Sequence, residues 1–273
     1  MSEAPFCLLT SLRHDVSLER VFIGDSLHPG WNYNHKSPLY MLDFHRDRLL
    51  RAAKHWQWTK AVEKLSGDEA LRELARMAQD AAVDTTKPQR LRILVDSQGT
   101  VTFEKFDTPS QPLENLYPRL LAPPGLMVGP GEPPHPSFDL VVDDGATQRS
   151  EFTHFKTTRR AVYDAARQRA GIKPGDLKEV LILNADDSSV MEGSITTPYF
   201  WRRGRWVTPP VSPSFSFNEG SGGHDGTSRR WALERGLAVE EAVVVDSLED
   251  GEKCWISNGV SGFQRAVVHR RVT

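Results

Sequence analysis

The chain has 273 residues, of which 38% are hydrophobic and 26% charged, and its formal net charge is −2. This length predicts one or two globular domains. The small net charge argues against a nucleic-acid binder, which shows a clustered basic surface, and no apolar run approaches the roughly 20 residues that span a membrane. The first residues lack the charged-then-apolar pattern of a secretory signal, so a cytoplasmic location is expected by elimination.

In the first half of the chain, alternating and helical patterns of apolar residues predict both strands and helices. The expected elements are strands over residues 6–23 and 39–43, a helix over FHRDRLLRAAKHWQW, a helix from about Asp68 to Ala82, and a hairpin of RLRILVD and VTFEKFD around the turn SQGT.

Prolines are dense from Thr108 to Pro136. Because proline lacks a backbone donor and fixes φ, this stretch is predicted to form neither a regular sheet nor a long helix. We therefore expect residues 116–136 to connect a small N-terminal α/β domain, residues 1–115, with a larger C-terminal domain, residues 137–273.

The second half again mixes short strands with helices and lacks a regular βαβ alternation, which predicts an α+β (mixed α/β) arrangement of two domains. A helix is expected over about residues 158–170, with Val162, Ala165 and Ala166 as its buried stripe. The other expected elements are a strand at KEVLILN, a hairpin at TPYFWRRGRWVTPP, a helix at TSRRWALERG, and strands over residues 240–246, 253–257 and 265–270.

Lys156 and Glu192 carry the strongest chemical signal. Lys156 lies in HFKTTRRAVYDAAR, directly before a predicted helix, and Glu192 lies in EGSITTPYF, after a predicted strand. A lysine amine forms a Schiff base with an aldehyde, and a carboxylate keeps a pyridine nitrogen protonated. Without its sequence context, each of the two residues would be interpreted as an ordinary surface charge. Within these two segments, they suit pyridoxal 5′-phosphate (PLP) chemistry.

These two segments resemble the fold-type-IV PLP enzymes, which comprise the class-IV aminotransferases and the 4-amino-4-deoxychorismate lyases. Three more elements of that family are present, one before and two after these segments. All five stand in the family's order, so the resemblance covers about residues 39–265. They are HRDRL with Arg48, GTSR with Thr227 and Ser228, and SNG with Ser257, Asn258 and Gly259.

The resemblance implies PLP as the cofactor, with Lys156 as the catalytic Schiff-base lysine and Glu192 at the pyridine nitrogen. The residues implied at the cofactor phosphate are Arg48, Thr227, Ser228, Ser257, Asn258 and Gly259. Gly259 stands where a hydroxyl residue is usual, so it would offer only its backbone. The resemblance also implies a two-domain fold like that of D-amino-acid aminotransferase, an active site between the domains, a homodimer, a small-molecule amino substrate and no metal site.

The reaction follows less directly from the resemblance. Branched-chain aminotransferases carry a tyrosine where this chain has Ala161, and Tyr163 comes two residues later. The HFKTT segment is more similar to the 4-amino-4-deoxychorismate lyases, so we predict elimination of pyruvate to give p-aminobenzoate, a step of folate biosynthesis. The alternatives are an aminotransferase of a D-amino acid, a branched-chain amino acid or an amine, and a catalytically altered homologue that acts as a binding protein.

The N-terminal segment FIGDSLHPGWNYNHKSPLY departs from the family's GDGxFET-like element, and only Gly24 and Asp25 match it. Because substrate-side groups come from this region in the family, the sequence does not predict the substrate. Four cations are candidates for binding a substrate carboxylate: Arg13, His28, Lys36 and Arg160.

Overall fold

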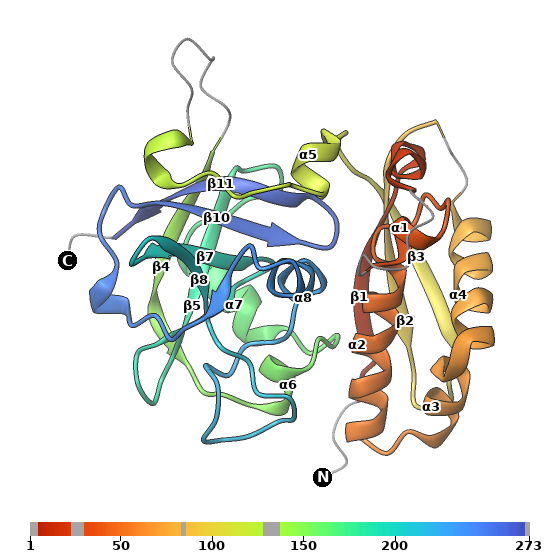
Figure 1. Cartoon of the computed structure of the whole chain (residues 1–273). Helices are drawn as coiled ribbons and strands as arrows, with labels where there is room; N and C mark the ends of the chain where they lie inside the picture. The colour runs from red at the N-terminus through yellow and green to blue at the C-terminus, as the bar shows by residue number, and fades with distance from the viewer. Residues whose placement is uncertain (1–4, 23–29, 83–85, 128–136, 271–273) are drawn as a thin grey trace. The chain divides into compact units, whose positions relative to one another are not determined.

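The computed structural model describes residues 5–22, 30–82, 86–127 and 137–270. Its contacts divide the chain into two compact units (Figure 1). Unit 1 comprises Met1–Leu113, Phe155–Arg159 and Gly259–Ser261, and unit 2 comprises Glu114–His154, Arg160–Asn258 and Gly262–Thr273. The sequence-based boundaries at residues 115 and 136 stay a prediction. The contacts place Lys156 in unit 1, although the chain on either side of its short segment belongs to unit 2.

Unit 1 contains a three-stranded antiparallel sheet in the order β1-β2-β3. Its strands are β1 (Leu8–His14), β2 (Gln89–Val95) and β3 (Val101–Asp107). The predicted β2–β3 hairpin is confirmed. The first predicted strand is too long, because the side chain of Asp15 accepts a hydrogen bond from the backbone N–H of Ser17 and caps the 3-10 helix η1 (Val16–Val21).

The helices of unit 1 are α1 (Trp31–Asn34), α2 (Leu42–His55), α3 (Thr59–Leu65) and α4 (Gly67–Ala81). Helix α2 packs on β1, and α4 contacts β3. The two predicted helices are confirmed as α2 and α4, whereas α3 was not predicted. The strand expected over residues 39–43 is wrong. Leu39 makes only an isolated bridge with His14, and Met41 has a left-handed backbone conformation (φ 51°) that turns the chain into α2.

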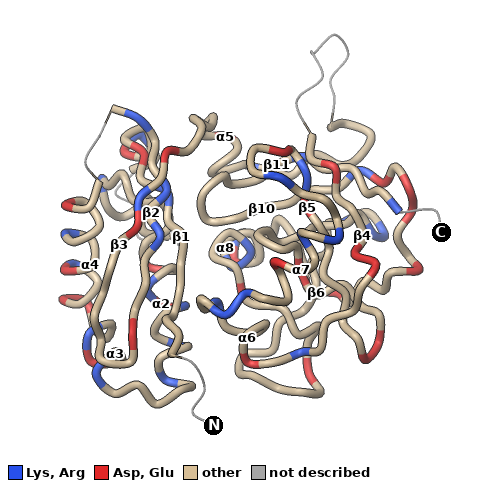
Figure 2. The backbone as a smooth tube through the Cα atoms, turned by 180° about the vertical axis from the view of Figure 1, so that it is seen from behind, with Lys and Arg blue, Asp and Glu red and all other residues tan. Residues whose placement is uncertain are grey.

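The outer face of α4 carries charges of both signs (Figure 2). Exposed ion pairs of 2.8 Å join Arg72 to Glu69, Arg76 to Glu73 and Arg76 to Asp80. Such exposed pairs stabilise a helix only slightly, so α4 is held by its buried face, which includes Leu74 and Ala78.

Unit 2 contains an eight-stranded sheet in the order β6-β5-β4-β11-β10-β7-β8-β9. Strand β4 runs parallel to β5 and β11, β8 runs parallel to β9, and the remaining pairs are antiparallel. The strands are β4 (Phe138–Thr147), β5 (Lys178–Asn184), β6 (Val190–Gly193), β7 (Thr197–Arg202), β8 (Arg205–Thr208), β9 (Val239–Glu240), β10 (Lys253–Asn258) and β11 (Gly262–His269).

The longer helices of unit 2 are α7 (Ala161–Arg169) and α8 (Thr227–Glu234), and both were predicted. The buried stripe of α7 differs from the prediction: Val162 is exposed, whereas Tyr163 and Ala166 are buried. The strand expected over residues 240–246 is also wrong, because pairing with β8 ends at Glu240. Short helical turns complete the unit: α6 (Glu151–His154), η2 (Pro124–Leu126) and η3 (Val245–Ser247).

The proline-rich stretch forms no long element where it is described. It contains α5 (Leu113–Leu116) and η2, and residues 128–136 lie outside the described part. The positions predicted to match the family at Gly24 and Asp25 also lie outside it. Among the helices of the described ranges, every one is too short or too polar to pass through a membrane.

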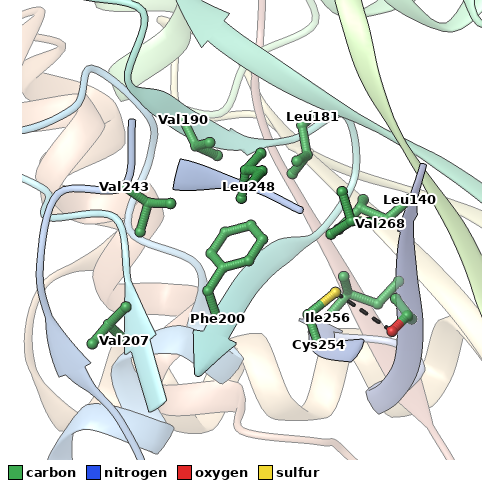
Figure 3. Close-up of a cluster of buried hydrophobic side chains, with 11 residues drawn as sticks. Leu140, Leu181, Val190, Phe200, Val207, Val243, Leu248, Cys254, Ile256 and Val268 are labelled. Atoms are coloured by element: carbon green, nitrogen blue, oxygen red, sulfur yellow. Dashed lines mark hydrogen bonds between the residues drawn. The ribbon is translucent and has the colours of Figure 1, made fainter. Parts of the chain in front are cut away.

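The sheet of unit 2 is held by a cluster of buried side chains (Figure 3). Phe200 lies among aliphatic residues from strands that are distant in sequence, including Val190 and Ile256. Cys254 belongs to this cluster, and its Sγ donates a hydrogen bond of 3.5 Å to the carbonyl of Ala266. Burial raises the pKa of the Cys254 thiol, so this cysteine is a neutral core residue.

Candidate functional site

Lys156 lies on a segment that runs along β1 in unit 1. The backbone N–H of Leu9 donates to the carbonyl of Lys156 at 2.9 Å, and Thr158 and Cys7 exchange hydrogen bonds of 3.0 Å. Lys156 is half-buried between the buried residues Phe155 and Thr157. The backbone at Lys156 is therefore fixed by strand-like pairing and does not depend on its side chain.

Arg48 is buried on α2, in the same unit. Its Nη2 donates a short hydrogen bond to Thr10 Oγ1, which lies 2.6 Å from Nδ1 of His45. Burial, followed by the positive charges of Arg48 and Lys156, holds the pKa of His45 well below its usual range. The imidazole of His45 is therefore neutral, and Arg48 carries the positive charge of this hydrogen-bonded cluster. A guanidinium in such a position is suited to an anionic group.

Gly259, in unit 1, accepts a hydrogen bond of 3.2 Å at its carbonyl from the backbone N–H of Arg13. The side chain of Arg13 is fully buried and pairs with Asp15 at 2.7 Å. Arg13 is thus part of the internal structure of unit 1. Of the other carboxylate-binding candidates, Lys36 is 69% exposed, Arg160 donates to the carbonyl of Ser194 at 2.7 Å, and His28 lies outside the described residues.

Glu192 is buried in unit 2, on β6, and is 3% exposed. Its Oε1 accepts a hydrogen bond of 2.6 Å from the phenol of Tyr163 on α7. Nδ1 of His224 lies 2.5 Å from Oε2, although its direction does not make a well-aligned hydrogen bond. Burial, the charge of Glu192 and the hydrogen bond to its Oε1 raise the pKa of Tyr163 well above its usual range. The phenol therefore stays protonated and acts as the hydrogen-bond donor to the carboxylate.

Two glycines allow the loop that carries His224 to lie against β6. A Cβ on Gly223 would lie 2.6 Å from the backbone oxygen of Met191, and Gly222 has a left-handed backbone (φ 90°). A side chain at either position would push the loop away from the strand. Gly222 and Gly223 therefore permit the close approach of this loop to β6 that the fold uses to bring His224 beside Glu192.

The turn that follows Glu192 is held by a second buried carboxylate, Glu179 on β5. Its Oε1 accepts hydrogen bonds from the N–H and Oγ of Ser194 at 3.2 and 2.5 Å, and its Oε2 accepts from Ile195 N and Thr196 Oγ1 at 3.1 and 3.0 Å. Nη1 of Arg167 lies 3.7 Å from Oε1. Glu179 thus satisfies the donors of the turn at the end of β6.

The substitution Glu179→Gln is expected to lower the free energy of unfolding by about 2–3 kcal/mol, because the new amide faces N–H and O–H donors in a buried site. Urea unfolding followed by circular dichroism measures this. The matched substitution Glu234→Gln, at an exposed position on α8 where the carboxylate pairs with Arg230, should change the free energy of unfolding by less than about 0.5 kcal/mol. Equal effects of the two substitutions would contradict the role of Glu179.

Three hydroxyls meet near the first turn of α8. The Oγ atoms of Ser228 and Ser257 lie 2.8 Å apart, and Tyr199 Oη lies 2.9 Å from Ser257 Oγ. Thr227 is buried, and its Oγ1 has no hydrogen-bond partner within the part of the chain that the structure describes. Free backbone N–H groups of a first helical turn and hydroxyls of this kind form a site for an anion.

The structure thus brings the hydroxyls of Ser228 and Ser257 together, next to Thr227 and Asn258, the last residue of β10, while the phosphate-binding role of these residues stays a prediction. The sequence did not indicate the contacts of Glu192. Tyr163 shares the buried face of α7 with Ala166, and that helical spacing could have identified it as buried. Nothing in the sequence around His224 signals its contact with Glu192.

Residues 30–267 match the family model for amino-transferase class IV. The aminodeoxychorismate lyase of Saccharomyces cerevisiae is 26% identical over 204 residues, which are 66% of this chain and 51% of that protein. This chain therefore spans about half the length of the yeast relative. A Schizosaccharomyces pombe protein provisionally named as the same lyase is 26% identical over 225 residues, 81% of this chain and 80% of that protein.

Among solved structures, the PLP-bound form of a hypothetical aminotransferase from Mycobacterium tuberculosis superposes with a TM-score of 0.58 at 16% identity. The match covers 96% of this chain and 81% of that chain, and it shows a shared mixed α/β fold. Proteins of the matched family generally use PLP. Because the family model matches most of its length, this chain belongs to the class IV aminotransferase family.

Proposed function

We propose that this protein binds PLP and eliminates pyruvate from 4-amino-4-deoxychorismate to give p-aminobenzoate. The observation that carries the proposal is the buried Glu192 carboxylate, whose Oε1 is held by the neutral phenol of Tyr163 at 2.6 Å. A buried carboxylate held in this way is the partner that a protonated pyridine nitrogen needs. The reaction is supported by the names of the two yeast relatives, at 26% identity.

The residues present fit the two polar ends of this cofactor. In unit 2, the unpartnered buried hydroxyl of Thr227 and the hydroxyls of Ser228 and Ser257 lie near the N-terminus of α8, where a phosphate finds N–H and O–H donors. The carboxylate of Glu192 suits the ring nitrogen. In unit 1, considered by itself, the buried guanidinium of Arg48 offers the kind of positive charge that a phosphate requires. Asn258 and the backbone of Gly259 complete the proposed phosphate set.

When bound, PLP supplies an electron sink that stabilises negative charge on the substrate carbon that bears the amine. Glu192 keeps the sink effective, because a fixed carboxylate in a buried site stabilises positive charge on the ring nitrogen more than water does. Lys156 attaches the cofactor through its amine. With its amine free, Lys156 Nζ would take the proton from the amine-bearing carbon and would return a proton to the enolpyruvate that leaves with the electron pair of its C–O bond, which gives pyruvate.

Transamination of an amino substrate is the second candidate, favoured by the family match and by the aminotransferase from M. tuberculosis. Both reactions begin with removal of the same proton by Lys156. They differ in the fate of the amino group, which a transferase keeps until a keto acid removes it. A homodimer that acts on a small amino substrate is part of both proposals.

The test supplies 4-amino-4-deoxychorismate and PLP without any keto acid. A lyase releases p-aminobenzoate, followed by its fluorescence, and an equal amount of pyruvate, followed with lactate dehydrogenase, over many turnovers. A transferase stops after one half-reaction and resumes only when a keto acid is added. A protein that takes up PLP but performs neither reaction would be a binding homologue, and one that takes up no PLP would overturn the proposal.

A further inference from the structure

Glu192 is contacted on both of its oxygens by side chains from other elements of unit 2. The phenol of Tyr163, on α7, donates to Oε1 at 2.6 Å, and Nδ1 of His224, on the glycine loop before α8, lies 2.5 Å from Oε2. The three side chains are buried, with exposed fractions of 2% for Tyr163, 3% for Glu192 and 9% for His224. The carboxylate is therefore fixed from two directions and shielded from water.

The short separation between His224 and Glu192 defines where a proton must be. Two unprotonated acceptor atoms would repel each other at 2.5 Å, so a proton lies between Nδ1 and Oε2. With that proton on Nδ1, His224 makes a close polar contact with Oε2, although the two groups are not aligned as a hydrogen bond. Donors to a buried carboxylate favour its ionised form over its neutral form, and the ionised form is the one that pairs with a protonated ring nitrogen.

The other charged side chains around this group have partners of their own. Asp225, next to His224, pairs with Arg229 at 3.1 Å. Arg160 lies over the ring of Tyr163, with its Cζ 4.6 Å from the ring centroid, and donates to Ser194. Glu179 is enclosed by the turn after β6 and by Arg167. Tyr163 and His224 are thus the side chains in direct contact with the Glu192 oxygens among the residues described.

We propose that Tyr163 and His224 are positioning residues that act through Glu192 on the ring nitrogen of the cofactor. They hold the carboxylate in one orientation by contacting both of its oxygens, so that it can pair with the protonated nitrogen. This inference rests on the proposed PLP site, but it does not depend on which reaction the site performs. The glycine loop before α8 would then serve the cofactor at two places. It carries His224 at the ring end, and it leads into Thr227 at the phosphate end.

The test measures binding of two ligands to the apoprotein: PLP, and its carbocyclic analogue with C–H in place of the ring nitrogen. His224→Leu and Tyr163→Phe are each expected to weaken PLP binding roughly tenfold, the effect of losing one polar contact to a charged group. Binding of the analogue, which has no ring nitrogen to pair with Glu192, should not change. His224→Asn, whose amide N–H can take the place of Nδ1–H, should restore most of the PLP affinity.

Tyr117→Phe is the matched control, because Tyr117 also lies in unit 2 and contacts the ring of Trp231. It should leave both affinities unchanged. If His224→Leu and Tyr163→Phe weaken PLP and the analogue equally, the two residues have only a structural role and the inference is wrong. If the unaltered apoprotein binds neither ligand, the proposed function itself fails. Thermal unfolding of each apoprotein separates loss of binding from loss of folding.

Discussion

Replacing Lys156 with alanine is expected to abolish covalent attachment of PLP and to lower turnover at least about a thousandfold, because no other group in the proposed site replaces its amine. The fold should survive, since the backbone carbonyl of Lys156, and not its side chain, pairs with Leu9 on β1. Borohydride reduction in the presence of PLP, followed by mass spectrometry of the chain, measures attachment. Steady-state release of p-aminobenzoate measures turnover.

Lys156→Arg is the matched variant, because it keeps a positive charge but cannot form the covalent link. It should be as inactive as the alanine variant while retaining the charge near His45. Lys54, on α2 and outside the proposed site, serves as the control, and Lys54→Ala should retain full attachment. Reduction that fixes PLP to the Lys156→Ala chain in the same amount as to the unaltered chain would show that another lysine carries the cofactor.

Arg13→Ala is expected to lower the free energy of unfolding by about 3–5 kcal/mol, because it leaves Asp15 buried without its cation. Arg13 is 0% exposed, and its Nε and Nη2 donate to Asp15 Oδ2 at 2.9 and 2.7 Å. It also donates to the carbonyls of Val260 at 3.2 Å and Pro109 at 3.0 Å. Urea unfolding at neutral pH measures the loss, with the exposed Arg20→Ala as a control that should change stability little.

The same ion pair predicts a pH dependence. Burial by itself would raise the pKa of Asp15, but hydrogen bonds from Ser17 and Arg13 outweigh it and lower the pKa below the usual value. The folded state therefore binds the Asp15 proton less tightly than the unfolded chain does. The resulting stabilisation is complete above the ordinary carboxyl pKa and is lost as the pH falls through the lowered pKa. Arg13→Ala should flatten this part of the stability curve, and an unchanged curve would contradict the role of the pair.

Local patterns predicted those elements whose own residues determine them. The amphipathic spacing of α2 and α4, the alternation of β2 and the turn after it are properties of short segments, and all appear in the structure. Five short motifs in one order also predicted the family, which the match over residues 30–267 confirms. These signals lie within a few neighbouring residues, so they can be read without knowing the fold.

Other features were decided by tertiary contacts. The pattern of α7 predicted Val162 on the buried side, but packing against β5 and β4 buries Tyr163 and leaves Val162 exposed. The strand expected over residues 240–246 does not form, because β9 ends at Glu240, where its pairing with β8 stops. Strand-like residues form a strand only where a neighbouring strand supplies hydrogen-bond partners, and a sequence does not state where that neighbour ends.

The surroundings of Glu192 depend most on tertiary structure. The sequence by itself predicted a glutamate in an EGS turn after a strand, but the structure places Glu192 within β6, with the turn beginning after Gly193. Only the fold brings Tyr163 from a helix and His224 from a glycine loop onto its two oxygens. Residues separated this widely along the chain meet through the packing of α7 and the loop against β6, and the chemistry of a buried carboxylate is set by the donors that such packing provides.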